Sequence, residues 1–229
     1  MSLLEQIPLF CGVEFTNKSE FENKCTIRKY NGGDRIFDYE EPSTEVGFIL
    51  SGSVRVFNRQ STGKEIILGD LGVGNFVGEM SAIDGLGRSA DVIALTSCEL
   101  LMVPSILFCD TCFDNPELSR RISLLFIDRI RELNTRLFEH HVLDAKYRLY
   151  SELLRMAKPC VTNSTQLTIS PPPFLQDVSY RVGCHKDEIT REINLMIKNG
   201  LLEKSIQSII ITKPEELKKL VDDAYAGAS

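Results

Sequence analysis

The 229-residue sequence lacks an apolar run long enough to cross a membrane. The best candidate, residues 100–109, holds ten uncharged residues before Asp110, whereas a membrane-spanning helix needs roughly 20. The first ten residues contain no basic segment, so we expect no signal peptide. The seven cysteines are scattered and odd in number, which suits reduced thiols better than a disulfide framework. These absences predict a cytoplasmic protein.

The sequence also has few of the groups that enzymes use. Its only histidines are His140, His141 and His185, and no serine–histidine–aspartate or cysteine–histidine pairing has local support. The glycine-rich loops lack the lysine of a phosphate-binding P-loop. Hydrophobic residues (43%) and charged residues (25%) occur at ordinary globular levels, enough for one large or two modest domains. We therefore expect a folded protein that is not an enzyme.

The net charge of -6 conceals an asymmetry along the chain. Residues 1–144 carry 14 basic and 22 acidic side chains, whereas residues 145–213 carry 10 basic and 6 acidic side chains. The second part is therefore compatible with a nucleic-acid partner, although a chance distribution would also produce such a difference.

Residues 25–103 consist of short apolar runs separated by glycine turns. Alternation is clear over residues 53–57, and turns recur about every 8 to 12 residues, among them Gly52 and Thr62-Gly63. This pattern predicts a small antiparallel β-sandwich or barrel.

Residues 117–158 contain neither glycine nor proline and are expected to form two helices that meet near Leu143-Asp144. Apolar residues of the first helix recur at spacings of 4, 4, 4, 3 and 4; they are Leu118, Ile122, Phe126, Ile130, Leu133 and Leu137. Leu124, Leu125 and Ile127 widen this face, so the helix needs two neighbours. We expect these to be its own sandwich and a second copy of the chain, the alternative being a purely intramolecular core helix.

The C-terminal part contains a helix-turn-helix pattern. An amphipathic helix reaches Gly183, and a second helix carries Ile189, Ile193 and Met196 and stops at Asn199-Gly200. Residues 201–211 are expected to form a hairpin, and a short exposed helix is expected to start at Pro214. Before this unit, residues 161–166 are predicted to form a loop or a short strand pair.

Residues 76–90 combine a strand end, a short helix that opens with a carboxylate, a glycine-rich loop and then Arg88-Ser89. Free N–H groups at a helix start attract an anion, and a guanidinium can grip two phosphate oxygens. The Glu79 carboxylate can accept hydrogen bonds from sugar hydroxyls. Phosphate and ribose held in one pocket indicate a nucleotide, whereas the structural alternative is a surface Glu–Arg salt bridge.

This segment resembles the phosphate-binding cassette of cyclic-nucleotide-binding domains in Gly78-Glu79, Ala82 and Arg88-Ser89-Ala90. From about residue 10 to residue 211 the chain resembles the family of bacterial transcription factors that includes the cyclic-AMP receptor protein and the fumarate and nitrate reduction regulator. The resemblance implies that Glu79 binds the ribose hydroxyl and Arg88 the phosphate. It also implies that Ser89 and the backbone amides of Gly78 and Met80 bind the remaining phosphate oxygens.

The resemblance further implies that the base points at the long helix. The family has a Thr-Ser pair there, whereas this chain has Leu133 and Asn134, followed by Thr135. Asn134 and Thr135 are therefore the candidate base partners. We expect cAMP as the ligand, with cGMP possible.

Residues 182–191 resemble the family's DNA-recognition helix, with Lys186, Asp187 and Arg191 at the base-reading positions. Arginine and, less rigidly, lysine bind guanine, and aspartate accepts from cytosine. His185 lies at the helix start, where it can contact a phosphate or cap the helix. The structural alternative to a DNA contact is that Asp187 and Glu188 stabilise the positive, N-terminal end of the helix dipole.

The fold expected is α+β: an antiparallel jelly-roll sandwich of the cyclic-nucleotide-binding type, a long dimerisation helix and a C-terminal winged helix-turn-helix. The three parts are predicted at residues 1–115, 116–144 and 145–229. The expected partners are a cyclic nucleotide, a palindromic double-stranded operator, a second copy of the chain and RNA polymerase, with no membrane and no metal. The alternative is a family member that binds DNA without a cyclic nucleotide, or that senses another small ligand or the redox state through the same sandwich. A redox role of Cys109 and Cys112 is left open.

Overall fold

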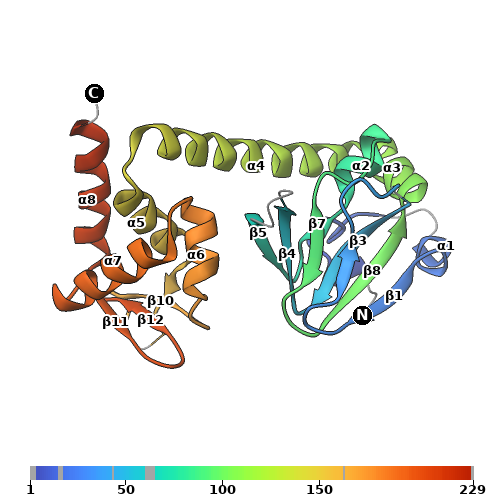
Figure 1. Ribbon diagram of the computed structural model, residues 1–229. Helices are drawn as coiled ribbons and strands as arrows, with labels where there is room; N and C mark the ends of the chain where they lie inside the picture. Colours follow the sequence, from blue (N-terminus) through green and yellow to red (C-terminus); the bar gives the residue numbers. More distant parts are fainter. Residues whose placement is uncertain (1–3, 15–17, 43, 60–64, 162, 228–229) are drawn as a thin grey trace. The chain divides into compact units, whose positions relative to one another are not determined.

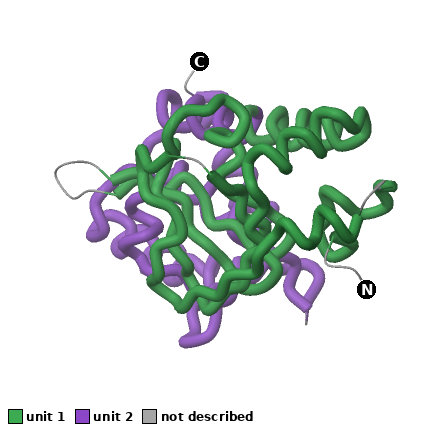
Figure 2. The backbone as a smooth tube through the Cα atoms, turned by 90° about the vertical axis from the view of Figure 1, so that its right-hand side faces the viewer, with its two compact units in different colours: residues 1–130 green, residues 131–229 purple. Residues whose placement is uncertain are grey.

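The computed structural model describes residues 4–14, 18–42, 44–59, 65–161 and 163–227. The chain divides into two compact units, Met1–Ile130 and Arg131–Ser229 (Figure 2). The predicted division into three parts remains a prediction, because the long helix contributes residues to both units. No helix among the described residues is long and apolar enough to cross a membrane.

The described residues of the first unit form a sandwich of two four-stranded sheets (Figure 1). Its strands are β1 (Thr26–Tyr30), β2 (Arg35–Phe37), β3 (Glu45–Ser51), β4 (Ser53–Arg59), β5 (Glu65–Gly72), β6 (Phe76–Val77), β7 (Asp91–Ala94) and β8 (Cys98–Pro104). One antiparallel sheet has the order β1-β8-β3-β6 and the other β2-β7-β4-β5. This strand order is that of a jelly roll, which confirms the predicted sandwich. The predicted turn at Thr62-Gly63 lies outside the described residues.

Alternation along β8 divides the apolar side chains between two cores. Leu100 and Met102 join the cluster between the sheets, whereas Leu101 and Val103 face the cluster under the helices. These helices are η1 (Leu4–Gln6), α1 (Lys18–Asn23), α2 (Glu79–Asp84), α3 (Ser105–Asp114) and the start of α4 (Pro116–Val142). Leu118 and Ile122 of α4 are buried in the second cluster, so the predicted packing of this helix on its own sandwich is observed.

The predicted break between the two long helices is also observed. Helix α4 ends at Val142 and α5 (Ala145–Met156) begins after Asp144, whose extended backbone starts the new helix. Arg148 secures this corner, because its Nη1 donates to the Leu143 carbonyl at 2.7 Å and its Nε to the Val182 carbonyl at 3.0 Å. The corner is therefore a hydrogen-bonded joint rather than a free linker.

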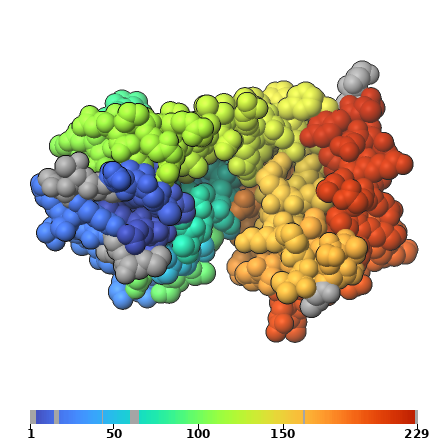
Figure 3. Space-filling view, turned by 180° about the vertical axis from the view of Figure 1, so that it is seen from behind, coloured from blue at the N-terminus to red at the C-terminus, as the bar shows by residue number. Residues whose placement is uncertain are grey.

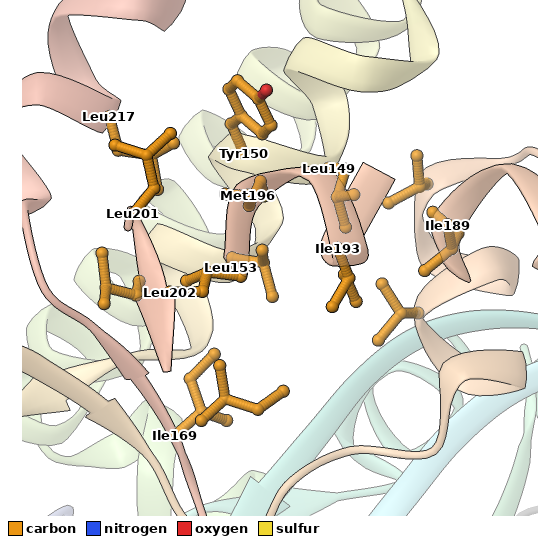
Figure 4. Close-up of a cluster of buried hydrophobic side chains, with 14 of the residues drawn as sticks. Leu149, Tyr150, Leu153, Ile169, Ile189, Ile193, Met196, Leu201, Leu202 and Leu217 are labelled. Atoms are coloured by element: carbon orange, nitrogen blue, oxygen red, sulfur yellow. The ribbon is translucent and has the colours of Figure 1, made fainter. Parts of the chain in front are cut away.

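The second unit packs helices on a small sheet of order β11-β12-β10-β9. Its further elements are β9 (Lys158–Pro159), β10 (Leu167–Ile169), α6 (Leu175–Val182), α7 (Lys186–Lys198), β11 (Leu202–Lys204), β12 (Ile209–Ile211) and α8 (Pro214–Gly227). Figure 4 shows the core, in which Leu149 and Leu153 of α5 meet Ile193 and Met196 of α7. Seen from behind in Figure 3, the tip of the β11–β12 hairpin protrudes from this unit.

The C-terminal helix α8 differs from the prediction of a short exposed helix. It has 14 residues, and its inner face is buried through Leu217 and Val221. Tyr225 stacks on Phe138 of α4 with ring centroids 5.8 Å apart. Leu217 and Val221 are four residues apart and therefore share one helix face, and the exposure prediction neglected this spacing.

Four charged side chains form a largely buried cluster in the second unit. Glu139 of α4 accepts two hydrogen bonds of 2.8 Å from Arg155 of α5, and Arg155 also pairs with Glu152. Glu152 in turn lies 3.4 Å from Arg181 of α6. Burial alone would lower the pKa of Arg155, but its pairing with the two carboxylates raises that pKa overall. We call Glu139, Arg155, Glu152 and Arg181 the ion cluster; it joins the end of α4 to α5 and α6.

Candidate functional site

The nucleotide cassette predicted from the sequence begins at Gly78, between β6 and α2. Gly78 has a φ of 87° and caps the N-terminus of α2. A Cβ atom at this position would lie 2.5 Å from Nη1 of Arg88, so the turn needs glycine both for its backbone and for its space. The short helix then ends at Gly85, which also has a positive φ.

Arg88 lies buried beneath this turn, with 5% of its surface exposed. Its Nη1 donates to the Gly78 carbonyl at 3.0 Å and to Ser81 Oγ at 2.9 Å, and Nη2 donates to the Glu45 carbonyl at 2.8 Å. The guanidinium also stacks 3.7 Å from the ring centroid of Phe37.

The electrostatics of Arg88 suit an anion. Burial lowers the pKa of its guanidinium, although the carboxylates of Glu41, Glu45 and Glu79 oppose that shift. Its Nε is buried and has no hydrogen-bond partner among the described residues. A buried, unsatisfied donor is costly, and a phosphate oxygen would satisfy it. The residues present therefore fit the phosphate of a nucleotide.

Glu79 opens helix α2 and is 4% exposed. Its carboxylate pairs with Nη1 of Arg129 on α4, and Nη2 of Arg129 donates to the Phe76 carbonyl at 3.3 Å. The guanidinium of Arg129 also faces the Phe76 ring, 5.4 Å from its centroid. The carboxylate is thus held in place at the site where a sugar hydroxyl was expected.

Arg129 was not among the residues predicted from the sequence. The sequence nevertheless contains a clue to Arg129. This residue follows Leu125 by four residues and Phe126 by three, so it shares a helix face with them on a stretch expected to be apolar. A basic residue at such a position needs a carboxylate partner from another element. Glu79 is that partner, 50 residues earlier in the chain.

The five cassette residues Gly78, Glu79, Met80, Arg88 and Ser89 line one cavity of about 130 Å³. Arg129 lines it too, and its apolar wall includes Val56, Leu71 and Val92. Ser89 presents an exposed hydroxyl, which lies 3.6 Å from the Met80 sulfur. The cavity therefore combines a polar end with an apolar wall, as recognition of a phosphorylated, partly apolar ligand requires.

Asn134 and Thr135 lie farther along α4, in the second unit. Both side chains are exposed, and the Thr135 hydroxyl donates to the Arg131 carbonyl at 3.0 Å, within its own helix. Their role as base partners stays a prediction.

The predicted helix-turn-helix is present as α6, a turn at Gly183 and α7. Gly183 has a φ of 72°, and a Cβ there would lie 2.9 Å from the His140 ring. Helix α7 buries Ile189, Ile193 and Met196. The predicted DNA-binding residues at the start of α7 and along it are exposed: His185, Lys186, Asp187 and Arg191. The His185 carbonyl accepts the first helical hydrogen bonds of α7, so this residue is the N-cap through its backbone.

The two thiols of the Cys109-x-x-Cys112 motif lie in α3 and are packed. Cys112 is fully buried, and burial raises its pKa to about 12. Burial also raises the pKa of Cys109, whose Sγ donates to the Ala82 carbonyl at 3.2 Å. Because the thiolate is the reactive form, these shifts disfavour redox chemistry near neutral pH. Among the described residues, no group of three histidine, cysteine or acidic side chains is arranged to hold a metal.

Comparison with known proteins gives a consistent result. The family model of the cyclic nucleotide-binding domain matches residues 27–114. The cAMP-activated global transcriptional regulator CRP of Escherichia coli O157:H7 is 27% identical over 194 residues, which cover 83% of this chain and 91% of the relative. A CRP-like cAMP-activated global transcriptional regulator of Mycobacterium tuberculosis is 21% identical over 218 residues, which cover 95% of this chain and 97% of the relative.

Solved structures share the fold at lower sequence identity. A CooA variant from Carboxydothermus hydrogenoformans aligns with a TM-score of 0.75 at 17% identity, covering 96% of each chain. The c-di-GMP-responsive global regulator CLP of Xanthomonas campestris aligns with a TM-score of 0.69 at 20% identity, covering 83% of this chain and 96% of CLP. With its jelly roll, its cassette and its helix-turn-helix in this order, the chain is similar to transcription regulators of the CRP/FNR family, and its residues 27–114 match the cyclic nucleotide-binding domain.

Proposed function

We propose that this protein is a DNA-binding transcription regulator under allosteric control by a cyclic nucleotide, with cAMP as the ligand. One observation carries the proposal: Glu79 and Arg88 line the same cavity, and the buried Nε of Arg88 has no partner among the described residues. The phosphate would satisfy this Nε, and Ser89 and the amides of Gly78 and Met80 would bind other phosphate oxygens. The choice of cAMP rests on the relatives in Escherichia coli and Mycobacterium tuberculosis, which are named as cAMP-activated.

The proposed ribose site involves both Glu79 and Arg129. The ribose hydroxyl can donate to the Glu79 carboxylate and accept from Arg129, so ligand binding would change a contact made by α4. The base would then lie toward α4, where Asn134 and Thr135 offer an amide and a hydroxyl. A ligand shifts DNA affinity only if it binds the DNA-competent conformation more tightly, and the Glu79–Arg129 contact is where we place this difference.

The second half of the proposal concerns DNA. Lys186, Asp187 and Arg191 would contact base edges, and His185 would contact a phosphate. Two copies would place two α7 helices in successive major grooves about 34 Å apart on a palindromic operator. RNA polymerase would be the further partner of the bound dimer.

Another ligand remains the second candidate, because CLP, which has the same fold, is named as responsive to c-di-GMP. Selection from random double-stranded DNA with cAMP, with cGMP and without nucleotide distinguishes these possibilities. We expect a palindromic motif whose affinity rises at least about 10-fold with cAMP. Unchanged affinity in saturating cAMP would refute the allosteric coupling. Failure to enrich any motif under any condition would refute the proposed DNA-binding function.

We propose that two copies of the chain pair through the outer face of α4. A charge placed on this face should therefore weaken the dimer strongly. Leu124, Ile127, Ile130, Leu133 and Leu137 are 44 to 59% exposed, and the last three follow 3–4 spacing, as in coiled coils. Replacing Leu133 with aspartate would bring two carboxylates together in an apolar seam. We expect the dimer dissociation constant, measured by sedimentation, to rise on the order of 100-fold.

Ile106→Asp is the matched control, since Ile106 is an exposed apolar residue of another helix, α3. It should leave the dimer intact. A wild-type monomer at micromolar concentration, or equal dissociation by the two variants, would contradict the proposed dimer helix.

A further inference from the structure

The outward face of α7 extends beyond the residues assigned to DNA so far. Successive residues of an α-helix are about 100° apart, so Asp187, Arg191 and Asn194 fall within about 60° of one another. All three are exposed. Ile189, Ile193 and Met196 occupy the opposite face, and Figure 4 shows Ile193 and Met196 among the core side chains of the second unit. Asn194 therefore lies on the solvent face about 20° from Asp187, whereas Lys186 lies about 100° away from Asp187.

The spacing of these residues along the axis of α7 limits which of them can reach base edges. At about 1.5 Å per residue, Asp187 and Asn194 are separated by about 10 Å along the axis. The major groove is about 12 Å wide, so a helix that lies in it can present both residues to base edges. Lys198, one turn further along the same face, would lie about 16 Å from Asp187, beyond the groove.

A second observation concerns the residue next to Asn194. Leu195 is 43% exposed and Ile197 is 37% exposed, whereas Ile189, Ile193 and Met196 of α7 are buried. Leu195 lies about 100° from Asn194, at the edge of the solvent face. An exposed leucine beside an exposed amide offers both an apolar and a hydrogen-bonding contact at one level of the helix.

We propose that Asn194 and Leu195 read an A·T-containing step of the operator, adjacent to the bases read by Arg191. The Asn194 amide would donate to adenine N7 and accept from adenine N6, a pair of contacts that no other base offers in this geometry. Leu195 would contact the methyl group of a thymine, the one apolar feature in the major groove. The assignment rests on the proposed function, because it requires α7 to bind in the major groove.

The experiment uses the full-length protein and the best operator selected by the wild type. We expect the selected half-site to contain one adenine whose replacement weakens binding on the order of 10-fold. Asn194→Ala should lose preference at that position alone. Deazaadenine, which lacks the N7 acceptor, should weaken wild-type binding and leave the Asn194→Ala variant unaffected. Deoxyuridine in place of thymidine, which removes the methyl group, should weaken binding by the wild type and leave binding by the Leu195→Ala variant unaffected.

Lys198→Ala is the matched control on the same face, and it should weaken binding uniformly across sequences, as loss of a phosphate contact does. If Asn194→Ala likewise weakens all sequences uniformly, or changes nothing, the assignment is overturned. Thermal unfolding of each variant verifies that the exposed substitutions leave the fold intact. If the wild type enriches no sequence at all, the proposed function fails instead.

Discussion

Replacing Arg88 with leucine should reduce cyclic-nucleotide binding by at least about 100-fold. Arg88 supplies the only guanidinium of the predicted cassette, and its unpaired Nε is buried where the phosphate is expected. Charge-assisted hydrogen bonds to phosphate are about twice as strong as neutral ones, and leucine offers none. The loss should therefore appear for both cAMP and cGMP, since both carry the same cyclic phosphate.

Calorimetric titration of each nucleotide into the purified protein measures this effect. Arg88 also donates to the carbonyls of Gly78 and Glu45, so its removal leaves buried acceptors unpaired and lowers stability. Arg55→Leu is the matched control: it removes an arginine of the same sandwich that pairs with Asp70 at 2.8 Å, and it should leave nucleotide affinity unchanged. Arg88→Lys keeps the charge and provides a second variant if the leucine variant does not fold.

Two results would contradict this prediction. Equal nucleotide affinity of the wild type and the Arg88→Leu variant would show that Arg88 does not bind the nucleotide. The absence of heat and of a thermal shift with either nucleotide in the wild type would show that the cavity takes a different ligand, as the relationship to CLP allows.

The cassette was predictable because its residues are close in the sequence. Gly78, Glu79 and Arg88 lie within 11 positions, and a strand end, a glycine turn and a short helix suffice to bring them together. Arg129 was not predictable in the same way, since its contact with Glu79 depends on how α4 packs on the sandwich. Helical periodicity assigns a residue to a face, but it does not identify the element that the face contacts.

The ion cluster illustrates the same limit in the second unit. The sequence predicts a break between two helices near Leu143-Asp144, and the structure has the break at these residues. Glu139, Glu152, Arg155 and Arg181 look like ordinary charges of amphipathic helices, yet Glu139 and Glu152 are nearly fully buried. Their burial arises because α5, α6 and the end of α4 converge, which no local pattern encodes.

Replacing Glu139 with glutamine should therefore lower the free energy of unfolding by about 3 kcal/mol, because it leaves Arg155 partly buried with one carboxylate fewer. Glu132→Gln is the matched control on the same helix. Glu132 pairs with Arg136 at 2.8 Å but its side chain is 53% exposed, so its loss should cost below about 0.5 kcal/mol. Circular dichroism during denaturant unfolding suits both variants, since the chain has no tryptophan.

Salt dependence provides an independent check of the same prediction. Solvent ions screen the exposed Glu132–Arg136 pair, so the small effect of Glu132→Gln should vanish in 1 M salt. The effect of Glu139→Gln should persist, because the carboxylate is 6% exposed and is held by two hydrogen bonds from Arg155. Equal losses for the two variants, or a Glu139→Gln effect that disappears in salt, would show that the ion cluster does not stabilise the joint between α4 and α5.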